Sequence, residues 1–474
     1  MFNFFRKKKS PKVIVIGLDC GEPSLMFDKW RDDLPTFRRL MDKGAYGPLT
    51  SAIPCITVPA WSSMLSSKDA GTLGIYGFRN RADYSYDKLT IATGAAVKEK
   101  RVWEYLGEAD KQSIVVGVPQ TYPIKPINGH LISSFLTPTV QKQYTHPNEL
   151  RYEIDQILEG QEYDVDVRQF RTEDKDFLLK QIYDMTEKRF KVLNYLIREK
   201  PWDFFMFVEM GVDRIHHGFW KYHDPEHHQY EPGNKYENAI KDYYIYIDRE
   251  VAKLLEAVDD DTVILVVSDH GAKRMDGGFC LNEWLRQEGY LVFKEELSTG
   301  NGLVKFDNKL VDWEKTTAWG DGGYYGRLSL NVQGREPQGL IPKADYEKVR
   351  TEIAIKLENM VDHNGKPLNT ICYKPEEIYK QVRNIPSDLL IYFGNLHWRS
   401  VGSLGHNSIY TFENDTGPDD ANHAQDGLII YYDPRKKLEG KQLSGLQLMD
   451  IAPTILDLLD QPVPADMQGR VITV

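Results

Sequence analysis

The stretch that most constrains the fold is residues 262–271, which read Thr-Val-Ile-Leu-Val-Val-Ser-Asp-His-Gly. An unbroken run of β-branched and aliphatic residues predicts a strand buried on both faces of a parallel sheet. The run stops at Ser268, and Asp269 and His270 follow at once. Because open α/β sheets bind ligands beyond the carboxyl ends of their strands, this carboxylate and imidazole are well placed to hold a metal ion. The alternative is an Asp that caps a helix beside a surface His.

Two further strand patterns also lead into metal-type ligands. Residues 12–18 (Lys-Val-Ile-Val-Ile-Gly-Leu) run directly into Asp19, and residues 202–208 precede Asp213 and His217. Asp213 and His217 are four residues apart, so on a helical turn they share one face and can chelate one ion. The recurrence of such ligands at separate strand ends favours a metal site over isolated helix caps.

Residues 57–65 predict a helix that begins at or next to Thr57 and carries Pro59 in its first turn. Proline suits that position because its missing N–H costs no helical hydrogen bond. The free N–H groups and the dipole of a helix N-terminus favour a bound anion. Thr57 is therefore either an ordinary helix cap or a hydroxyl beside an anionic substrate.

The candidate metal ligands are carboxylates and imidazoles from several predicted strand ends: Asp19, Asp213, His217, Asp269, His270 and His423. Such a set suits two Zn²⁺ or Mn²⁺ ions, since it requires no cysteine. Two neighbouring ions can hold the attacking and leaving oxygens of an in-line displacement at phosphorus. A Thr57 hydroxyl bound to one of them loses its proton and becomes a usable nucleophile.

With these residues in place, the chain resembles the alkaline phosphatase superfamily, and within it the branch of type I phosphodiesterases, nucleotide pyrophosphatases and related phosphohydrolases or phosphomutases. The resemblance rests on segments in the family's order: residues 13–19, 57–61, 71–75 and 268–271, Asp213 with His217, Asn422 with His423, and residues 450–454. It implies a three-layer α/β/α fold with a mostly parallel central sheet and two insertions. It also implies a metal-dependent phosphate-ester hydrolase that works through a phospho-threonine intermediate.

The resemblance also implies a role for each ligand. By position, one divalent ion, zinc or manganese, would be held by Asp213, His217 and His423. The second ion would be held by Asp19, Asp269, His270 and the Thr57 oxygen. The backbone N–H of Val58 would bind a phosphate oxygen.

Further substrate contacts are predicted on residue type alone. Trp61 and Tyr324 are candidate walls for an apolar substituent, together with Trp319 and Tyr325. Arg327 is a candidate cation for a phosphate group, together with Arg79, Arg81 and Arg274. His406 is a candidate neighbour of the site or of the substrate. Since a solvated Arg or a core aromatic is the common use of such residues, monoester or diester preference stays open.

Breaks in the strand pattern divide the chain into a core in three parts, residues 11–134, 201–277 and 385–474. Residues 135–200 are predicted to be a helical insertion, because residues 176–200 have the spacing of one long amphipathic helix. Residues 278–384 are predicted to be a second insertion or cap. Residues 388–393 are expected to return the chain to the central sheet.

Composition excludes several classes of protein. A net charge of −11 over 474 residues argues against stable nucleic-acid binding. No apolar run reaches the roughly 20 residues that span a bilayer. Residues 1–9 place an apolar part before a basic part, the wrong order for a secretory signal. The four cysteines lack CxxC spacing, which indicates reduced thiols. We expect a cytoplasmic protein, with an oligomer possible, whose partner is a phosphate-ester small molecule or a nucleotide.

Two alternative reactions use the same fold. A phosphomutase or phosphotransferase would pass the phosphoryl group to a second hydroxyl, although no sugar-phosphate pocket is recognisable in the sequence. A sulfatase would need a Cys or Ser followed by Pro and Arg at fixed spacing, and residues 55–59 (Cys-Ile-Thr-Val-Pro) lack both at those positions. The sequence therefore favours hydrolysis of a phosphate ester.

Overall fold

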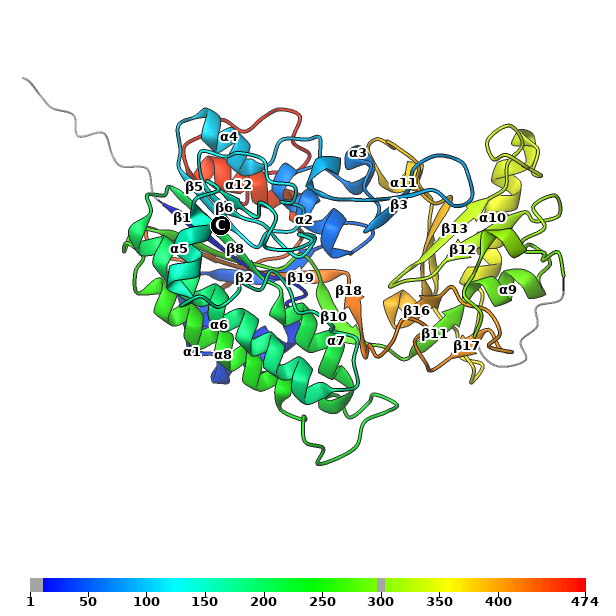
Figure 1. Cartoon of the computed structure of the whole chain (residues 1–474), viewed down its shortest axis with the longest axis horizontal. Helices are drawn as coiled ribbons and strands as arrows, with labels where there is room; N and C mark the ends of the chain where they lie inside the picture. The colour runs from blue at the N-terminus through cyan, green and yellow to red at the C-terminus, as the bar shows by residue number, and fades with distance from the viewer. Residues whose placement is uncertain (1–11, 296–302) are drawn as a thin grey trace, which may run out of the picture.

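A computed structural model describes residues 12–295 and 303–474. Residues 1–9, which were not expected to be a secretory signal, lie outside the described part. The chain forms a larger lobe built on one broad sheet and a smaller lobe at one end of it (Figure 1). In the described residues, no helix is long and apolar enough to cross a membrane.

The larger lobe is organised around a 10-stranded, mostly parallel sheet with the order β20-β2-β19-β9-β1-β8-β5-β6-β7, and β21 pairs with β2. Strands β1, β8, β9, β5 and β6 run parallel, whereas β19 is antiparallel to both of its neighbours. The strands are β1 (Val13–Leu18), β2 (Ala45–Thr50), β5 (Ser113–Val116), β6 (Gly129–Ile132), β7 (Thr145–His146), β8 (Phe204–Glu209), β9 (Val263–Val267), β19 (Asp426–Tyr432), β20 (Lys441–Gln442) and β21 (Leu446–Gln447).

The central strands are buried on both faces, as their apolar runs predict. In β1, Ile14 and Ile16 belong to one apolar core and Val13 and Val15 to the other. Alternate side chains of a strand point to opposite faces, so a sheet with two cores must be covered on both sides. This is the three-layer α/β/α arrangement.

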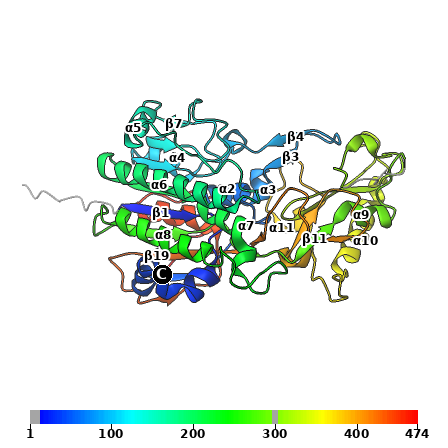
Figure 2. The same cartoon turned by 60° about the horizontal axis from the view of Figure 1, so that its bottom comes forward.

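Helices form the two outer layers (Figures 1 and 2). One core contains side chains from α1 (Pro35–Lys43), α5 (Leu150–Ile157), α6 (Lys175–Glu199), α7 (Gly211–His223) and α8 (Ala239–Leu255). The other core contains side chains from α2 (Thr57–Ser66), α4 (Val102–Glu108) and α12 (Ile451–Leu458), and the short α3 (Ala70–Leu73) follows α2. The long helix predicted at residues 176–200 is α6, and it lies beside α7 and α8 in the first layer.

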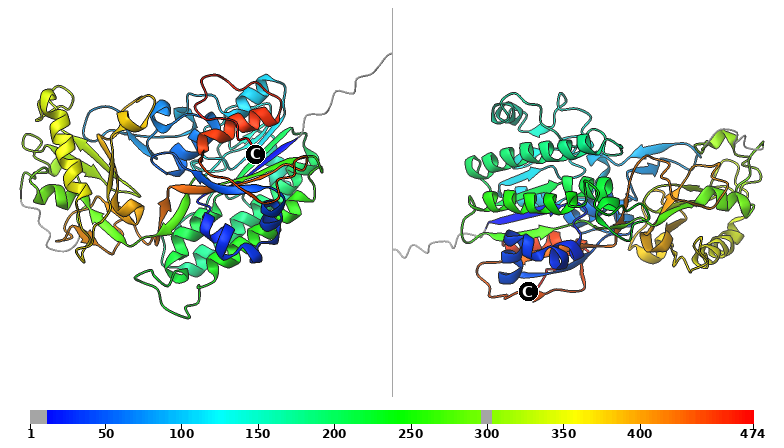
Figure 3. Two further views of the ribbon diagram at one scale, coloured as in Figure 1. Left: turned by 180° about the vertical axis from the view of Figure 1, so that it is seen from behind. Right: turned by 90° about the horizontal axis from the view of Figure 1, so that it is seen from below.

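The smaller lobe, seen in two views in Figure 3, carries a third apolar core of its own. It contains a four-stranded sheet, β12-β13-β15-β14, and a three-stranded sheet, β16-β11-β17. Its elements are β11 (Gly277–Cys280), α9 (Leu281–Gln287), β12 (Ala318–Asp321), β13 (Gly326–Leu330), α10 (Tyr346–Glu358), β14 (Ile371–Tyr373), α11 (Pro375–Ile378), β15 (Leu389–Tyr392), β16 (Trp398–Val401) and β17 (Tyr410–Thr411).

Short elements connect the lobes. The antiparallel pair β10 (Gly271–Arg274) and β18 (Ala421–Ala424) leads the chain out of the larger lobe and back into it. A hairpin of β3 (Arg79–Arg81) and β4 (Leu89–Ile91) extends from the larger lobe toward the smaller one. Single turns of 3-10 or π helix lie at Ser24–Lys29, Arg31–Asp33, Gly94–Ala96, Asn308–Leu310, Lys343–Asp345, Phe393–Leu396 and Leu448–Asp450.

One strand expectation is wrong. Residues 388–393 do form a strand, but β15 pairs with β13 and β14 in the smaller lobe and does not return to the central sheet. The smaller lobe accordingly extends past residue 385, through β16 and β17, before β18 re-enters the larger lobe. A short apolar run indicates a buried strand, but it carries no information about which sheet the strand joins.

Candidate metal centre and substrate pocket

The parallel pairing of the central strands brings the predicted ligands to one edge of the sheet. Asp19 follows β1 and Asp269 follows β9, and these two strands are direct neighbours. The next strand, β8, leads into α7, which carries Asp213 and His217 one turn apart. His423 lies on β18, in register with Ala272 just beyond His270. Asp269 caps no helix, because β10 begins two residues later.

The first ligand group consists of Asp19, Asp269 and His270, all fully buried. His270 Nε2 lies 3.2 Å from Asp269 Oδ2 and 3.8 Å from Asp19 Oδ1. The second oxygens of both carboxylates are fixed: Asp19 Oδ2 accepts from Trp61 Nε1 at 2.7 Å, and Asp269 Oδ1 accepts from the backbone N–H of Cys20 at 3.1 Å. Within the described residues, Asp19 Oδ1 and Asp269 Oδ2 have no hydrogen-bond partner.

The second group consists of Asp213, His217 and His423. His217 Nε2 lies 3.2 Å from both Asp213 Oδ1 and His423 Nε2, and His423 Nε2 is 3.9 Å from Asp213 Oδ1. The rings of His423 and His270 stack with centroids 3.8 Å apart, so the two groups are contiguous. Asp213, His270 and His423 together also satisfy the spacing of a metal site.

The hydrogen bonds of the imidazoles decide which nitrogens face inward. Nδ1 of His270 lies 3.1 Å from the Gly271 carbonyl, and Nδ1 of His423 lies 2.8 Å from the Cys55 carbonyl. Only an N–H can approach a carbonyl oxygen in this way, so both Nδ1 atoms carry the proton and both Nε2 atoms present a lone pair. His217 Nδ1 likewise donates to Asp419 Oδ1 at 2.6 Å. The lone pairs of His270 Nε2 and His423 Nε2 therefore face carboxylate oxygens. His217 differs: burial opposes its protonation, but Asp419, Tyr324 and Asp213 outweigh burial and raise its pKa well above the ordinary value. Its Nε2 therefore carries a proton toward Asp213 unless a cation takes the place of that proton.

The charges of these buried carboxylates and imidazoles favour bound cations. Burial lowers the pKa of His270 to about 4 and lowers that of His423 well below its ordinary value, so neither ring is a cation near neutral pH. Burial, reinforced by neighbouring carboxylates, raises the pKa values of Asp19 and Asp269. Lone pairs and carboxylate oxygens that face one another without protons repel unless positive charge lies between them. Divalent ions fit these two groups, which would hold them through oxygen and nitrogen ligands alone.

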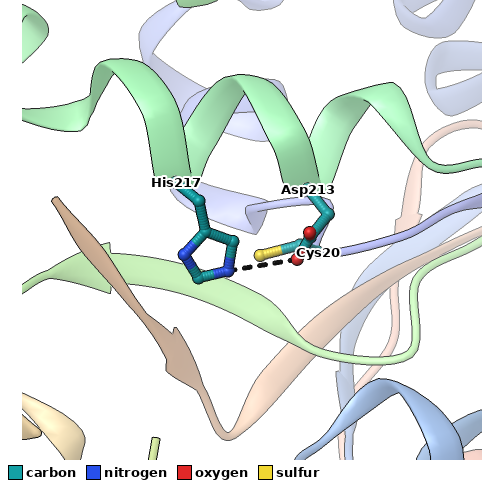
Figure 4. A group of neighbouring side chains, drawn as sticks. All are labelled: Cys20, Asp213 and His217. Carbon is teal, nitrogen blue, oxygen red and sulfur yellow. Dashed lines mark ion pairs between the residues drawn. The ribbon is translucent and has the colours of Figure 1, made fainter. Parts of the chain in front are cut away.

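Cys20 lies beside the second group but is a poor ligand. Figure 4 shows its thiol next to Asp213 and His217. Its Sγ contacts the Gly271 carbonyl at 3.4 Å, and burial raises the thiol pKa well above its ordinary value, so the group stays protonated. Cys20 has φ 63°, which a residue other than glycine adopts at a cost. That turn directs its N–H at Asp269. All four cysteines are free thiols.

Thr57 is the first residue of α2, and its hydroxyl faces the metal ligands. Oγ1 lies 3.4 Å from His270 Nε2, and no side chain caps this helix. The N–H groups of Thr57 and Val58 have no intrahelical acceptor, since the first helical bond is donated by Ala60 to Ile56. A hydroxyl and free N–H groups thus share one side of the site, with the helix dipole favouring an anion there.

A pocket of about 470 Å³ opens in front of Thr57, Asp213 and His423 and lies between the two lobes. Tyr324 forms one wall, with its ring stacked on His423 at 4.2 Å between centroids. Arg327 also lines the pocket. The larger lobe contributes apolar walls from Phe78, Phe135 and Phe170. Of the predicted substrate contacts, Tyr324, Tyr325, Arg327 and Arg79 line the pocket. Val58 lies at the start of the helix that borders it.

Five predicted substrate contacts do not line this pocket: Trp61, Trp319, Arg81, Arg274 and His406. Trp319 packs in the core of the smaller lobe, Arg81 pairs with Glu336, and Arg274 pairs with Glu226 and Asp276. Trp61 is fully buried in the core beneath the sheet edge and donates to Asp19, so it orients a ligand and offers no wall to substrate. His406 belongs to the smaller lobe, where its Nε2 lies 2.8 Å from Ser403 Oγ. It does not line the pocket in front of Thr57.

The side chains that support His217 were not predicted from the sequence. Asp419 is fully buried: its Oδ1 accepts from His217, and its Oδ2 accepts from Arg171 at 3.2 Å and from Arg399 at 2.8 Å. Burial opposes ionisation of Asp419, but His217 and Arg399 outweigh it and lower the pKa. Asp419 lies four residues before His423, which is the only sequence signal that could have pointed to it.

Fold and site together define an α/β phosphoric ester hydrolase of the alkaline phosphatase superfamily. The family model described as type I phosphodiesterase / nucleotide pyrophosphatase matches residues 13–419, and the chain belongs to this family. The resemblance and fold class expected from the sequence are thereby confirmed. Among curated proteins no match was found.

Several solved structures share the fold. Human ectonucleotide pyrophosphatase / phosphodiesterase 5 is 11% identical, with a TM-score of 0.56 over 96% of each chain. The inactive murine form in complex with AMP is 12% identical, with a TM-score of 0.55 over 96% of each chain. Phosphonoacetate hydrolase from Sinorhizobium meliloti, in complex with phosphonoformate, is 14% identical, with a TM-score of 0.59 over 95% of this chain and 96% of the other.

Proposed function

We propose that this enzyme hydrolyses phosphate esters with two divalent metal ions, zinc or manganese, and with Thr57 as the nucleophile. The observation that carries the proposal is the Thr57 hydroxyl, which starts α2 and lies 3.4 Å from His270 Nε2 at the edge of the ligand cluster. Asp213, His217 and His423 would hold one ion. Asp19, Asp269, His270 and the Thr57 oxygen would hold the other.

The bound ions supply charge that lowers the pKa of a hydroxyl and stabilises oxyanions during displacement at phosphorus. The residues of the chain then have distinct tasks. Thr57 Oγ1 loses its proton and forms a bond to phosphorus, while the bond from phosphorus to the leaving oxygen breaks. The N–H of Val58 would hold a phosphoryl oxygen at the N-terminus of α2. Water then attacks phosphorus in the phospho-Thr57 intermediate and the bond to Oγ1 breaks, which restores the hydroxyl and releases phosphate from a monoester substrate or a phosphate monoester from a diester substrate.

The walls of the pocket support a small organic ester or a nucleotide as substrate. Tyr324 and the phenylalanines of the larger lobe provide flat apolar surfaces beside Thr57. Such surfaces suit the organic part of an ester, and an aromatic base in particular. The AMP bound by the inactive murine relative is consistent with a nucleotide substrate.

Turnover of p-nitrophenyl phosphate and of bis-p-nitrophenyl phosphate would test the proposal directly. Protein freed of metal and reloaded with Zn²⁺ or Mn²⁺ should hydrolyse at least one of them, and Thr57→Ala and Asp269→Ala should each abolish the activity. Thr90→Ala on the exposed strand β4 is the matched control and should retain it. Full activity in Thr57→Ala, or silence of the metal-loaded wild type on both esters, would contradict the proposed mechanism.

A further inference from the structure

The substrate pocket concentrates positive charge in a protein that is acidic overall. The net charge of the chain is −11, yet five arginines line this one pocket: Arg79, Arg171, Arg214, Arg327 and Arg399. Of the described residues, the only carboxylates that line it are Asp166 and the proposed metal ligand Asp213. A pocket with this balance favours anionic groups and focuses them toward Thr57.

Three of the five arginines are committed to carboxylates. Arg214 donates to Asp213 at 2.6 Å and to Asp166 at 2.7 and 3.0 Å. Arg171 and Arg399 both donate to Asp419, the carboxylate that supports His217. These guanidinium groups hold the metal ligands in place, and their charge is largely compensated.

The other two arginines are not compensated. Among the residues that the structure describes, the guanidinium of Arg327 donates only to backbone carbonyls, those of Arg79 at 3.1 Å and Gly322 at 3.3 Å. Asp321 lies opposite Arg327 in β12 but forms no ion pair with it. In the described part of the chain, the guanidinium of Arg79 has neither a hydrogen bond nor an ion pair, although its backbone contacts Arg327. Two adjacent cationic residues thus line the pocket with donors to spare.

These two residues come from different lobes. Arg79 lies on β3 of the hairpin that extends from the larger lobe, and Arg327 begins the pairing of β13 with β12 in the smaller lobe. They meet where the lobes come together at the pocket, since Arg327 donates to the Arg79 carbonyl at 3.1 Å. Guanidinium groups bind carboxylate and phosphate through paired hydrogen bonds, which gives both affinity and orientation.

We propose that the substrate carries a second anionic group, a phosphate or a carboxylate, on the part that leaves, and that Arg327 and Arg79 bind it. This inference rests on the proposed function, which places the reacting phosphoryl group at Thr57. The proposed metal ions are balanced by the three ligand carboxylates and the reacting group. The uncompensated charge of Arg327 and Arg79 is then available only to a further anion. Arg327 acts as a specificity residue, and Arg79 supports it from the opposite lobe.

Binding of unreactive phosphonates to the zinc-loaded enzyme would test the inference by calorimetry. The probes are alkyl phosphonates of increasing chain length that end in a carboxylate, each paired with its carboxamide. A second series ends in phosphate. At the best chain length the carboxylate should bind about tenfold more tightly than its amide, which corresponds to ~1.4 kcal/mol. The preference should shrink as salt is added, because screening weakens exposed charge pairs. The series whose terminal anion raises the affinity more identifies the group, carboxylate or phosphate, that the two arginines prefer.

Substitutions at Arg327 and Arg79 distinguish an effect of their charge from an effect on the folded structure. Arg327→Gln should remove the preference for the carboxylate while leaving the carboxamide affinity unchanged, and Arg79→Gln should reduce it. Arg327→Lys should retain part of it, since the charge remains after the two carbonyl contacts are lost. Lys366→Gln removes a charge from the exposed surface of the same lobe and should behave as wild type.

Equal binding of carboxylate and carboxamide at every chain length, or a preference that survives in Arg327→Gln, would overturn the inference. In that case the phosphonates would still bind, and the proposed function would stand. If no phosphonate binds the metal-loaded enzyme, the proposed function fails first. The two failures are therefore distinguishable.

Discussion

Replacing Asp419 with Asn would show how far the metal centre depends on support behind its ligands. Asp419 accepts the Nδ1–H of His217 at 2.6 Å, and that bond fixes the tautomer that presents Nε2 toward Asp213. Loss of such a partner typically lowers metal affinity 10- to 100-fold, or about 1.4–2.7 kcal/mol. Asn keeps an oxygen that can accept the hydrogen bond, but it removes the charge that favours a proton on Nδ1.

The same substitution has a second consequence for stability. Asp419 is the shared carboxylate of Arg171 and Arg399, so its neutralisation leaves two guanidinium groups without a counter-charge. Breaking a buried ion pair in this way costs about 3–5 kcal/mol. Arg171 keeps some exposure to solvent, which places the expected loss at the lower end of that range. The thermal midpoint should fall, while the protein remains folded at room temperature.

Competition with a chromophoric chelator would measure the affinity for each zinc ion. In Asp419→Asn, one of the two affinities should fall 10- to 100-fold and the other should stay at the wild-type value. Asp420→Asn is the matched control, because Asp420 is equally buried and its carboxylate pairs with Lys221 and not with a ligand. Wild-type affinity for both ions in Asp419→Asn, or an equal loss in Asp420→Asn, would refute the argument.

Three further predictions follow from the site and the core. Trp61→Phe removes the N–H that holds Asp19 and should lower zinc affinity about tenfold with little change in fold; chelator competition measures it. Chelation of the ions should lower the thermal midpoint at neutral pH, since Asp19 and Asp269 then lose their counter-charge while Asp213 keeps Arg214; calorimetry with and without chelator checks this. Burial lowers the pKa of His227 to about 4. As pH falls, the unfolded protein therefore binds a proton at this residue before the folded protein does. The free energy of unfolding should fall by up to about 3 kcal/mol as pH drops from ~6.5 to ~4. Denaturant titrations of His227→Gln should show a smaller loss over the same range.

The sequence was sufficient to predict the core of the fold and where its ligands gather. The apolar runs that became β1, β8 and β9 are long and unbroken, so both the strands and their burial could be read from them. Because parallel strands end at the same edge of a sheet, Asp19 and Asp269 could be expected to meet. The four-residue spacing of Asp213 and His217 likewise predicted a shared helix face, which α7 provides.

What could not be predicted depends on contacts between distant segments. Arg399 lies on β16 of the smaller lobe, and Asp419 lies just before β18, which returns the chain to the larger lobe. Nothing in the local sequence of either residue marks it as part of the group around His217. Tryptophan is a residue type that often lines pockets, but the position of Trp61 on α2 directs its side chain toward the core. The strand β15 carries the same apolar signal as the central strands, and only its pairing partners assign it to the smaller sheet.

The most direct test of the account is to trap the reaction at Thr57. The metal-loaded enzyme would be mixed with excess ester, quenched in acid during turnover and digested for mass spectrometry. The proposed mechanism predicts a phosphoryl group on Thr57 in the wild type and none in Thr57→Ala. The group should disappear when the labelled enzyme is incubated without substrate. Steady turnover with no phosphoryl group on Thr57 at any quench time, or with the group on another residue, would contradict the central claim.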